Sequence, residues 1–97
     1  MTLNELRFIV AVAQERNFRR AAEKSFISQP ALSLAVRKLE QELGEPLFDR
    51  SSRDGILTDA GLVLRDYALK LLNTRQEAFT ALEELRQMVK GKLSLAA

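Results

Sequence analysis

The chain has 97 residues, is 46% apolar and carries a net charge of +2, which suits one small domain with a narrow margin of stability. It contains no cysteine and no histidine. This excludes disulfides, thiolate nucleophiles, histidine bases and almost every zinc site. The acidic residues are scattered through helical patterns rather than paired in loops, so we expect no catalytic residue, no metal ligand and no enzyme activity.

The N-terminal segment shows no sign of export or membrane insertion. Its longest apolar run, residues 8–13, is too short to span a bilayer. Neither a basic leader nor a cleavage site accompanies this run. We therefore expect a cytoplasmic protein that does not contact a membrane.

The basic residues are concentrated in one segment. Residues 16–38 contain six bases and one acid, a local charge of +5, whereas residues 39–49 contain four acids and no base. A positive surface beside a negative one orients a protein on a polyanion. Ordinary solvated helices carry charge runs too, so this distribution supports nucleic-acid binding without establishing it.

Two helices are predicted in the first 25 residues. Apolar residues recur at helical spacing over residues 3–15. Asn17 is a suitable N-cap for a second helix from Phe18 to about Ser25, whose inner face contains an alanine pair that allows close crossing. We assign Phe18, Phe26 and Phe48 to the hydrophobic core.

A third helix is predicted from its N-cap, Ser28, to about Leu43, before Gly44. Pro30 falls in its first turn, where the missing N–H has no cost. The apolar residues on its inward stripe are Leu32, Val36, Leu39 and Leu43. The residues that project the opposite way are Pro30, Ser33, Arg37 and Gln41, with Gln29 and Leu34 at the edges. Residues 17–37 therefore predict a helix-turn-helix whose second helix presents hydrogen-bonding and cationic groups, as binding in a DNA major groove requires.

Residues 47–57 are predicted to form a small β-hairpin, which we name the wing. Leu47-Phe48 and Ile56-Leu57 suit two short strands, and Asp54-Gly55 tolerates the positive φ of a tight turn. The polar residues near its tip include Arg50, Ser52 and Arg53, and such arginines reach the DNA backbone or a narrow minor groove. Arg50 has an alternative role, a structural ion pair with Asp49 or Glu45.

A long helix is predicted from Asp59 to about Val89, capped by Thr58. It carries two apolar stripes, of which one can pack on the protein's own core and the other requires a partner helix. We expect Gly91 to end it. The alternating residues 92–96 then indicate a strand at the start of a further domain.

From Leu3 to Ala97 the chain resembles the DNA-binding half of the LysR-type transcriptional regulators. The residues that carry the resemblance are Phe18, Ala21-Ala22, Ser28-Gln29-Pro30-Ala31-Leu32-Ser33, Leu39-Glu40, Leu43-Gly44, Leu47-Phe48, Arg50, Leu57-Thr58 and Gly61. The resemblance implies a mainly α fold, a winged helix-turn-helix with a three-helix core over residues 1–58. It also implies a linker helix over residues 59–90 and the start of an effector-binding domain at 91–97.

The resemblance further implies a homodimer held by linker helices, a tetramer in the full-length protein, and binding to an interrupted palindrome in double-stranded DNA near a promoter. No cofactor is expected within this chain, whereas a small-molecule effector is expected for the missing domain. The residues expected at the dimer contact are Leu64, Tyr67, Leu71, Ala78 and Leu85. Their alternative role is packing within the subunit.

Two sets of DNA contacts are predicted. The candidates for base contact are Gln29, Pro30, Ser33, Leu34 and Arg37, because glutamine pairs with adenine and arginine with guanine or phosphate. The candidates for phosphate contact are Arg19, Arg20, Lys24, Ser28 and Thr58. Arg37 could instead pair with Gln41 or Glu40, and Leu34 stands where relatives often carry polar or basic residues.

A rival function belongs to another class. The helix-turn-helix could be purely structural in a helical module that binds a protein through its long helix. Steep salt dependence of binding to random duplex DNA would separate the two, because only a DNA binder releases counterions.

Overall fold

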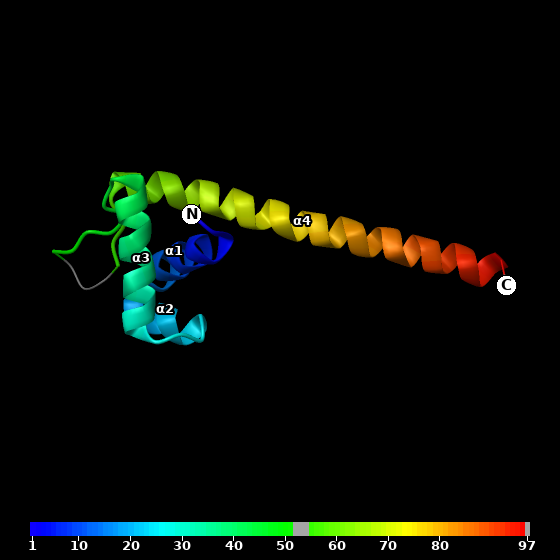
Figure 1. The fold of residues 1–97 in the computed structure, drawn as a ribbon, viewed down its shortest axis with the longest axis horizontal. Coiled ribbons are helices and arrows are strands. Elements are labelled where there is room, and N and C mark those ends of the chain that lie inside the picture. Colours follow the sequence, from blue (N-terminus) through cyan, green and yellow to red (C-terminus); the bar gives the residue numbers. More distant parts are fainter. Residues whose placement is uncertain (52–54, 97) are drawn as a thin grey trace.

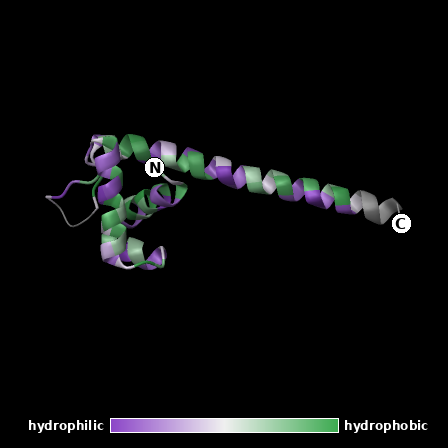
Figure 2. Cartoon of the chain, in the orientation of Figure 1, coloured by the Kyte–Doolittle hydropathy of each residue, from purple (hydrophilic) through white to green (hydrophobic). Residues whose placement is uncertain are grey.

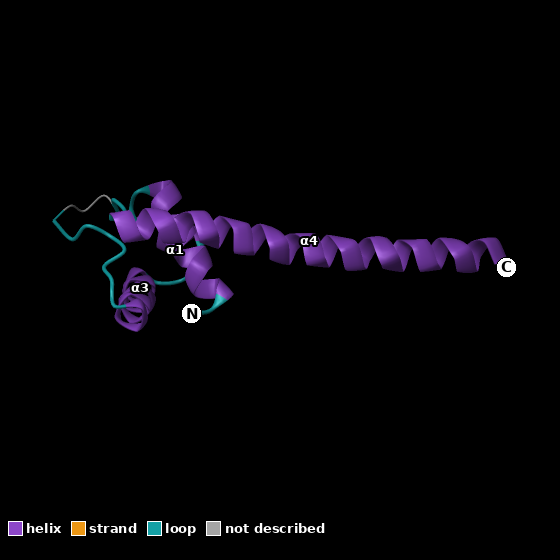
Figure 3. Ribbon diagram, turned by 90° about the horizontal axis from the view of Figure 1, so that it is seen from above, coloured by secondary structure: helices purple, strands orange, loops and turns teal. Residues whose placement is uncertain are grey.

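The computed structural model describes residues 1–51 and 55–96, with side chains as far as Gly91. It contains four helices in the described ranges: α1 (Leu3–Glu15), α2 (Phe18–Lys24), α3 (Gln29–Leu43) and α4 (Asp59–Ala96). The first three helices and the segment that follows them form a compact head, and α4 leaves this head as a rod (Figure 1). The molecule is therefore elongated, with principal extents of 65 × 24 × 19 Å. Seen from above, the described residues of the wing and the free end of α4 project from the head in opposite directions (Figure 3).

Side-chain caps fix where the first three helices begin. Thr2 starts α1 with a capping box, in which its hydroxyl accepts from the Glu5 N–H while the Glu5 carboxylate accepts from the Thr2 N–H. The predicted caps Asn17 and Ser28 are confirmed, since their side chains accept from Arg20 N at 2.9 Å and Ala31 N at 3.2 Å. Gly44 ends α3 in the left-handed conformation at φ 71°, as predicted.

The core lies where α1, α2 and α3 meet. The predicted inward residues Leu32, Val36 and Leu39 of α3 are buried, whereas Leu43 at the end of the helix is 39% exposed. The residues that pack with them are Ile9, Val12, Ala21, Ala22, Leu47 and Phe48. The Phe18 and Phe48 rings meet edge to face with centroids 5.4 Å apart, which ties the start of α2 to the wing.

The prediction that Phe26 belongs to the core is wrong, because its side chain is 94% exposed. Phe26 lies in the turn between α2 and α3 with a φ of 58°, and this left-handed backbone carries its side chain outward. The turn is held by hydrogen bonds from Phe26 N to Glu23 O and from Ile27 N to Ala22 O. Ile27 packs against the core instead.

The wing is less regular than the predicted hairpin. Phe48 and Leu57 form an isolated antiparallel bridge, and no strand is assigned within residues 47–51 and 55–57. Two backbone bonds flank the bridge, from Asp49 N to Ile56 O at 2.8 Å and from Thr58 N to Leu47 O at 3.0 Å. Among the described residues, the pairing found in the wing lies at its base.

The predicted turn is only partly described. Gly55 has a φ of 58°, as a turn there requires. Asp54, and the wing candidates Ser52 and Arg53, lie outside the described residues.

The cap of α4 agrees with the prediction. The Thr58 hydroxyl accepts from Gly61 N at 3.1 Å and donates to the Pro46 carbonyl at 2.6 Å. The first turns of the helix then pack on α1, where Leu64, Ala68 and Leu72 meet Leu6 and Val10.

The far end of α4 differs from the prediction. The helix continues through Gly91 to Ala96, so the expected stop at Gly91 and the strand over residues 92–96 are wrong. A single glycine costs a helix only about 1 kcal/mol, whereas a lone strand has no partner for its backbone groups. Apolar segments continue along α4 beyond the head (Figure 2). None of the helices in the described ranges is both long and apolar enough to cross a bilayer.

Two glycines of α4 provide a matched test of this packing. A Cβ on Gly61 would collide with the Leu47 carbonyl oxygen and approach Leu57 Cδ2 to 2.8 Å, whereas a Cβ on Gly91 would meet nothing within 4 Å. We expect Gly61→Ala to lower the free energy of unfolding by about 3 kcal/mol or more, because backbone must move. Gly91→Ala should raise the helix content, because alanine is about 1 kcal/mol more favourable than glycine within a helix. Thermal unfolding followed by far-UV circular dichroism measures both, and an unchanged midpoint for Gly61→Ala would contradict the close approach.

Candidate nucleic-acid interface

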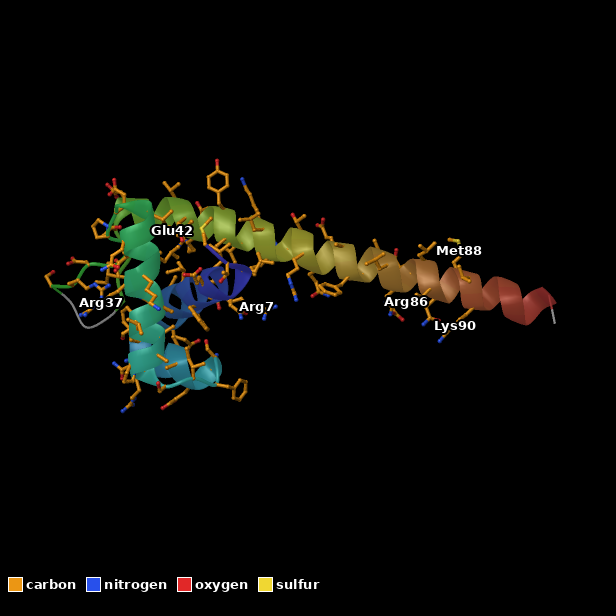
Figure 4. The ribbon with its side chains drawn as sticks, in the orientation of Figure 1. Arg7, Arg37, Glu42, Arg86, Met88 and Lys90 are labelled. Atoms are coloured by element: carbon orange, nitrogen blue, oxygen red, sulfur yellow. The ribbon has the colours of Figure 1, made fainter. Side chains whose placement is uncertain are left out.

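The outer face of α3 is uncovered by the described elements. Gln29, Pro30 and Arg37 are exposed, Leu34 is 55% exposed and Ser33 is half-buried. Arg37 projects from α3 on the side away from α1 (Figure 4). All five candidates for base contact are therefore accessible to a ligand on that side of the head.

Three elements meet in a groove beside this face. The residues that line it are Asn17, Phe18, Arg19, Gln29, Ser33, Asp49 and Arg50. The groove thus brings together two candidates for base contact from α3, one candidate for phosphate contact from α2 and one arginine of the wing. We name it the α2–α3 groove.

Arg50 is held by an acid that the sequence did not suggest for it. Its guanidinium donates to Glu40 Oε1, and neither predicted partner, Asp49 or Glu45, forms an ion pair with it. Glu40 Oε2 also accepts from Leu47 N at 2.7 Å. The alternative role of Arg37, an ion pair with Glu40, is not seen among the described residues, since that carboxylate is already engaged by Arg50 and the wing backbone.

The candidates for phosphate contact fall into two groups. Arg19 and Arg20 are exposed at the start of α2, whereas Lys24 forms an ion pair with Glu15 at 3.0 Å. Such a surface pair is worth at most about 1 kcal/mol, so Lys24 can exchange it for another anion. Ser28 and Thr58 both act as helix caps, with Ser28 exposed and Thr58 half-buried.

Asp49 adds a negative charge to the α2–α3 groove. Its carboxylate accepts from the Ser51 hydroxyl at 2.6 Å and from the Ser51 N–H at 2.9 Å. These hydrogen bonds lower the pKa of Asp49 from its ordinary value. Asp49 therefore remains ionised at neutral pH and opposes the binding of phosphate at that edge. The sequence signals neither this role nor that of Glu40, since both depend on contacts made by the wing.

The candidates for dimer contact lie on α4. Tyr67, Leu71 and Leu85 are 58%, 44% and 56% exposed, and Ala78 is exposed too. Leu64 is half-buried and packs against the core of its own head, as its alternative role expects. Beyond the head, further apolar side chains of α4 are exposed: Phe79, Leu82, Met88 and Val89.

Comparison with known proteins identifies the family. Residues 3–62, which span α1, α2, α3, the wing and the start of α4, match the family described as "Bacterial regulatory helix-turn-helix protein, lysR family". Among curated proteins, the chain is 45% identical over 96 residues to the "Probable RuBisCO transcriptional regulator" of Trichormus variabilis, covering 99% of this chain and 28% of that protein. The regulator of the same name from Cyanidioschyzon merolae is also 45% identical, over 99% of this chain and 32% of its own length. The chain thus spans about a third or less of the relatives it matches.

Solved structures agree in fold. The complex described as BenM_DBD with benA site 1 DNA superposes with a TM-score of 0.85 at 39% identity, covering 88% of this chain and 96% of that chain. Vibrio fischeri DarR in complex with DNA gives a TM-score of 0.83 at 32% identity, over 91% of this chain and 30% of that chain. The predicted mainly α helix-turn-helix class is confirmed, and the chain belongs to the lysR family of bacterial regulatory helix-turn-helix proteins.

Proposed function

We propose that this chain binds double-stranded DNA sequence-specifically as a homodimer and so regulates transcription. The observation that carries the proposal is the α2–α3 groove, in which Gln29 and Ser33 lie beside Arg19 and Arg50. Groups that hydrogen-bond to base edges and groups that bind phosphate are the two components of a sequence-specific DNA site. Two similar structures, those of BenM_DBD and DarR, are described as DNA complexes, which supports the proposal.

The outer face of α3 is proposed to lie in the major groove. Gln29 and Ser33 contact base edges near the N-terminus of the helix, while Pro30 and Leu34 offer apolar contacts to a thymine methyl. Arg37, one turn further along, meets a guanine or a phosphate. Arg19, Arg20 and Lys24 position the head on the backbone without specifying sequence.

The dimer is proposed to form through α4. The exposed Tyr67, Leu71 and Leu85, with Ala78, form a stripe at heptad spacing that has no covering element among the described residues. Two reading helices must enter successive major grooves on one face of the duplex, about 34 Å apart. The α4 pairing then sets the spacing between half-sites.

Three further expectations remain proposals. A small-molecule effector binds a further domain of the full-length protein, a tetramer forms in that protein, and the protein acts in the cytoplasm, where it meets DNA. The greater length of the regulators of T. variabilis and C. merolae supports a further domain.

Gln29→Ala and Arg19→Ala test the division between base and phosphate contacts. We expect Gln29→Ala to cost about 1–3 kcal/mol of binding free energy at one base pair and little elsewhere. Arg19→Ala should weaken binding to all sequences by a similar factor and reduce the salt slope by about one. Titration of a selected duplex and of random duplex at two salt concentrations measures both. Equal losses on both duplexes from both variants would contradict the division of roles.

Leu71→Glu tests the α4 dimer. A carboxylate in an apolar helix interface is desolvated without a partner, so we expect the dimer dissociation constant to rise by about tenfold or more. Leu69→Glu is the matched control, because Leu69 is 37% exposed on the same helix and lies about 200° around its axis from Leu71. Sedimentation equilibrium distinguishes the two variants. Equal dissociation of both, or of neither, would argue against this stripe as the interface.

A further inference from the structure

The hydrogen bonds found for the Glu40 carboxylate all join it to residues of the wing. Its side chain is only 12% exposed. One oxygen accepts from Leu47 N at 2.7 Å and, more weakly, from Phe48 N at 3.4 Å, while the other accepts from the Arg50 guanidinium. One residue of the proposed DNA-reading helix therefore fixes both the backbone at the base of the wing and the side chain of its first arginine.

Arg50 gains an orientation from this contact. A free arginine side chain loses up to about 2 kcal/mol of conformational freedom when it is fixed, and an ion pair formed in advance removes part of that cost from DNA binding. Glu40 accepts a hydrogen bond from Nη2 of the planar Arg50 guanidinium, which has five N–H donors in all. The Arg50 side chain stays 45% exposed, so its other donors remain available to a second anion.

The position of Arg50 suits that second anion. It lines the α2–α3 groove together with Gln29 and Ser33, and it also lines a neighbouring hollow with Arg37 and Gln41. A guanidinium at the boundary between α3 and the wing faces the position where a backbone would pass if α3 lay in a major groove. Its forked geometry matches a phosphate.

We propose that Glu40 is a positioning residue for DNA binding, which holds Arg50 in the orientation that meets a phosphate at the edge of the groove read by α3. The inference rests on the proposed function, since it names a contact within that DNA site. Removing a negative charge near DNA ordinarily strengthens binding, whereas here removing the Glu40 charge weakens it.

The test compares two substitutions that change charge equally. In the 97-residue chain, Glu40→Gln should weaken binding to random duplex about tenfold, the value of one charge-assisted hydrogen bond, and lower the salt slope by about one. Glu45→Gln is the matched control, because Glu45 is exposed at the neighbouring hollow and makes no ion pair with Arg50. It should bind equally well or more tightly.

A double-mutant cycle assigns the effect to Arg50. Arg50→Ala should reproduce the loss of affinity and of salt slope, and adding Glu40→Gln to it should cause no further loss. If Glu40 serves only to stabilise the fold, Glu40→Gln lowers the unfolding midpoint while the folded protein binds DNA as before or more tightly, and the proposal is overturned. If Glu40→Gln fails to fold, Arg50→Ala still tests the phosphate contact that the proposal requires, and an unchanged salt slope overturns the proposal.

Failure of the proposed function would look different. In that case the unsubstituted chain itself would show no salt-dependent binding to duplex DNA. A chain that binds duplex DNA, with Glu40→Gln binding no more weakly, overturns the positioning role alone.

Discussion

Burial of one side of α3 determines which of its side chains remain available for binding. Leu32, Val36 and Leu39 are each at most 1% exposed and pack against α1 and α2. Full burial of each such side chain contributes about 1.5–3 kcal/mol. Rotating the helix about its axis to hide its polar residues would forfeit that energy and bury Arg37 without a partner. The polar outer face is therefore fixed by the apolar inner face.

The wing depends on α3 in a second way. Its base is paired through one bridge, Phe48 with Leu57, and its backbone is bound to Glu40. Phe48 is also buried in the core and touches Phe18 at the start of α2. Through these contacts the arginine of the wing, the start of α2 and the start of α3 occupy one groove, although they come from segments far apart in the sequence.

Local signals in the sequence predicted much of this arrangement. Asn17, Ser28 and Gly44 mark helix ends through interactions within a few residues, and the apolar spacing of α3 gives its buried side. The predictions fail where contacts between elements, rather than the local sequence, decide the structure. The apolar character of Phe26 predicts a buried side chain, but the left-handed backbone of the turn directs it outward. Gly91 lies within α4 because one glycine costs a helix only about 1 kcal/mol, and the residues on both sides of it are helical.

The interactions between distant residues were the hardest to predict. Asp49 and Glu45 are the predicted ion-pair partners of Arg50 because they are near it in the chain. In the structure Arg50 pairs with Glu40, which α3 brings alongside the wing. The same limit applies to Leu64, since heptad spacing does not tell whether an apolar residue packs on its own head or on a partner. The contact of Leu64 with its own head depends on the path of α4 across α1.

The most direct test of the account is to map duplex DNA onto the chain by following its backbone amide resonances during a titration. We predict that the largest changes fall on residues 28–37, at the start of α2 and around Arg50, and that they weaken as salt is added. Changes confined to the exposed apolar stripe of α4, with residues 28–37 unaffected, would contradict it.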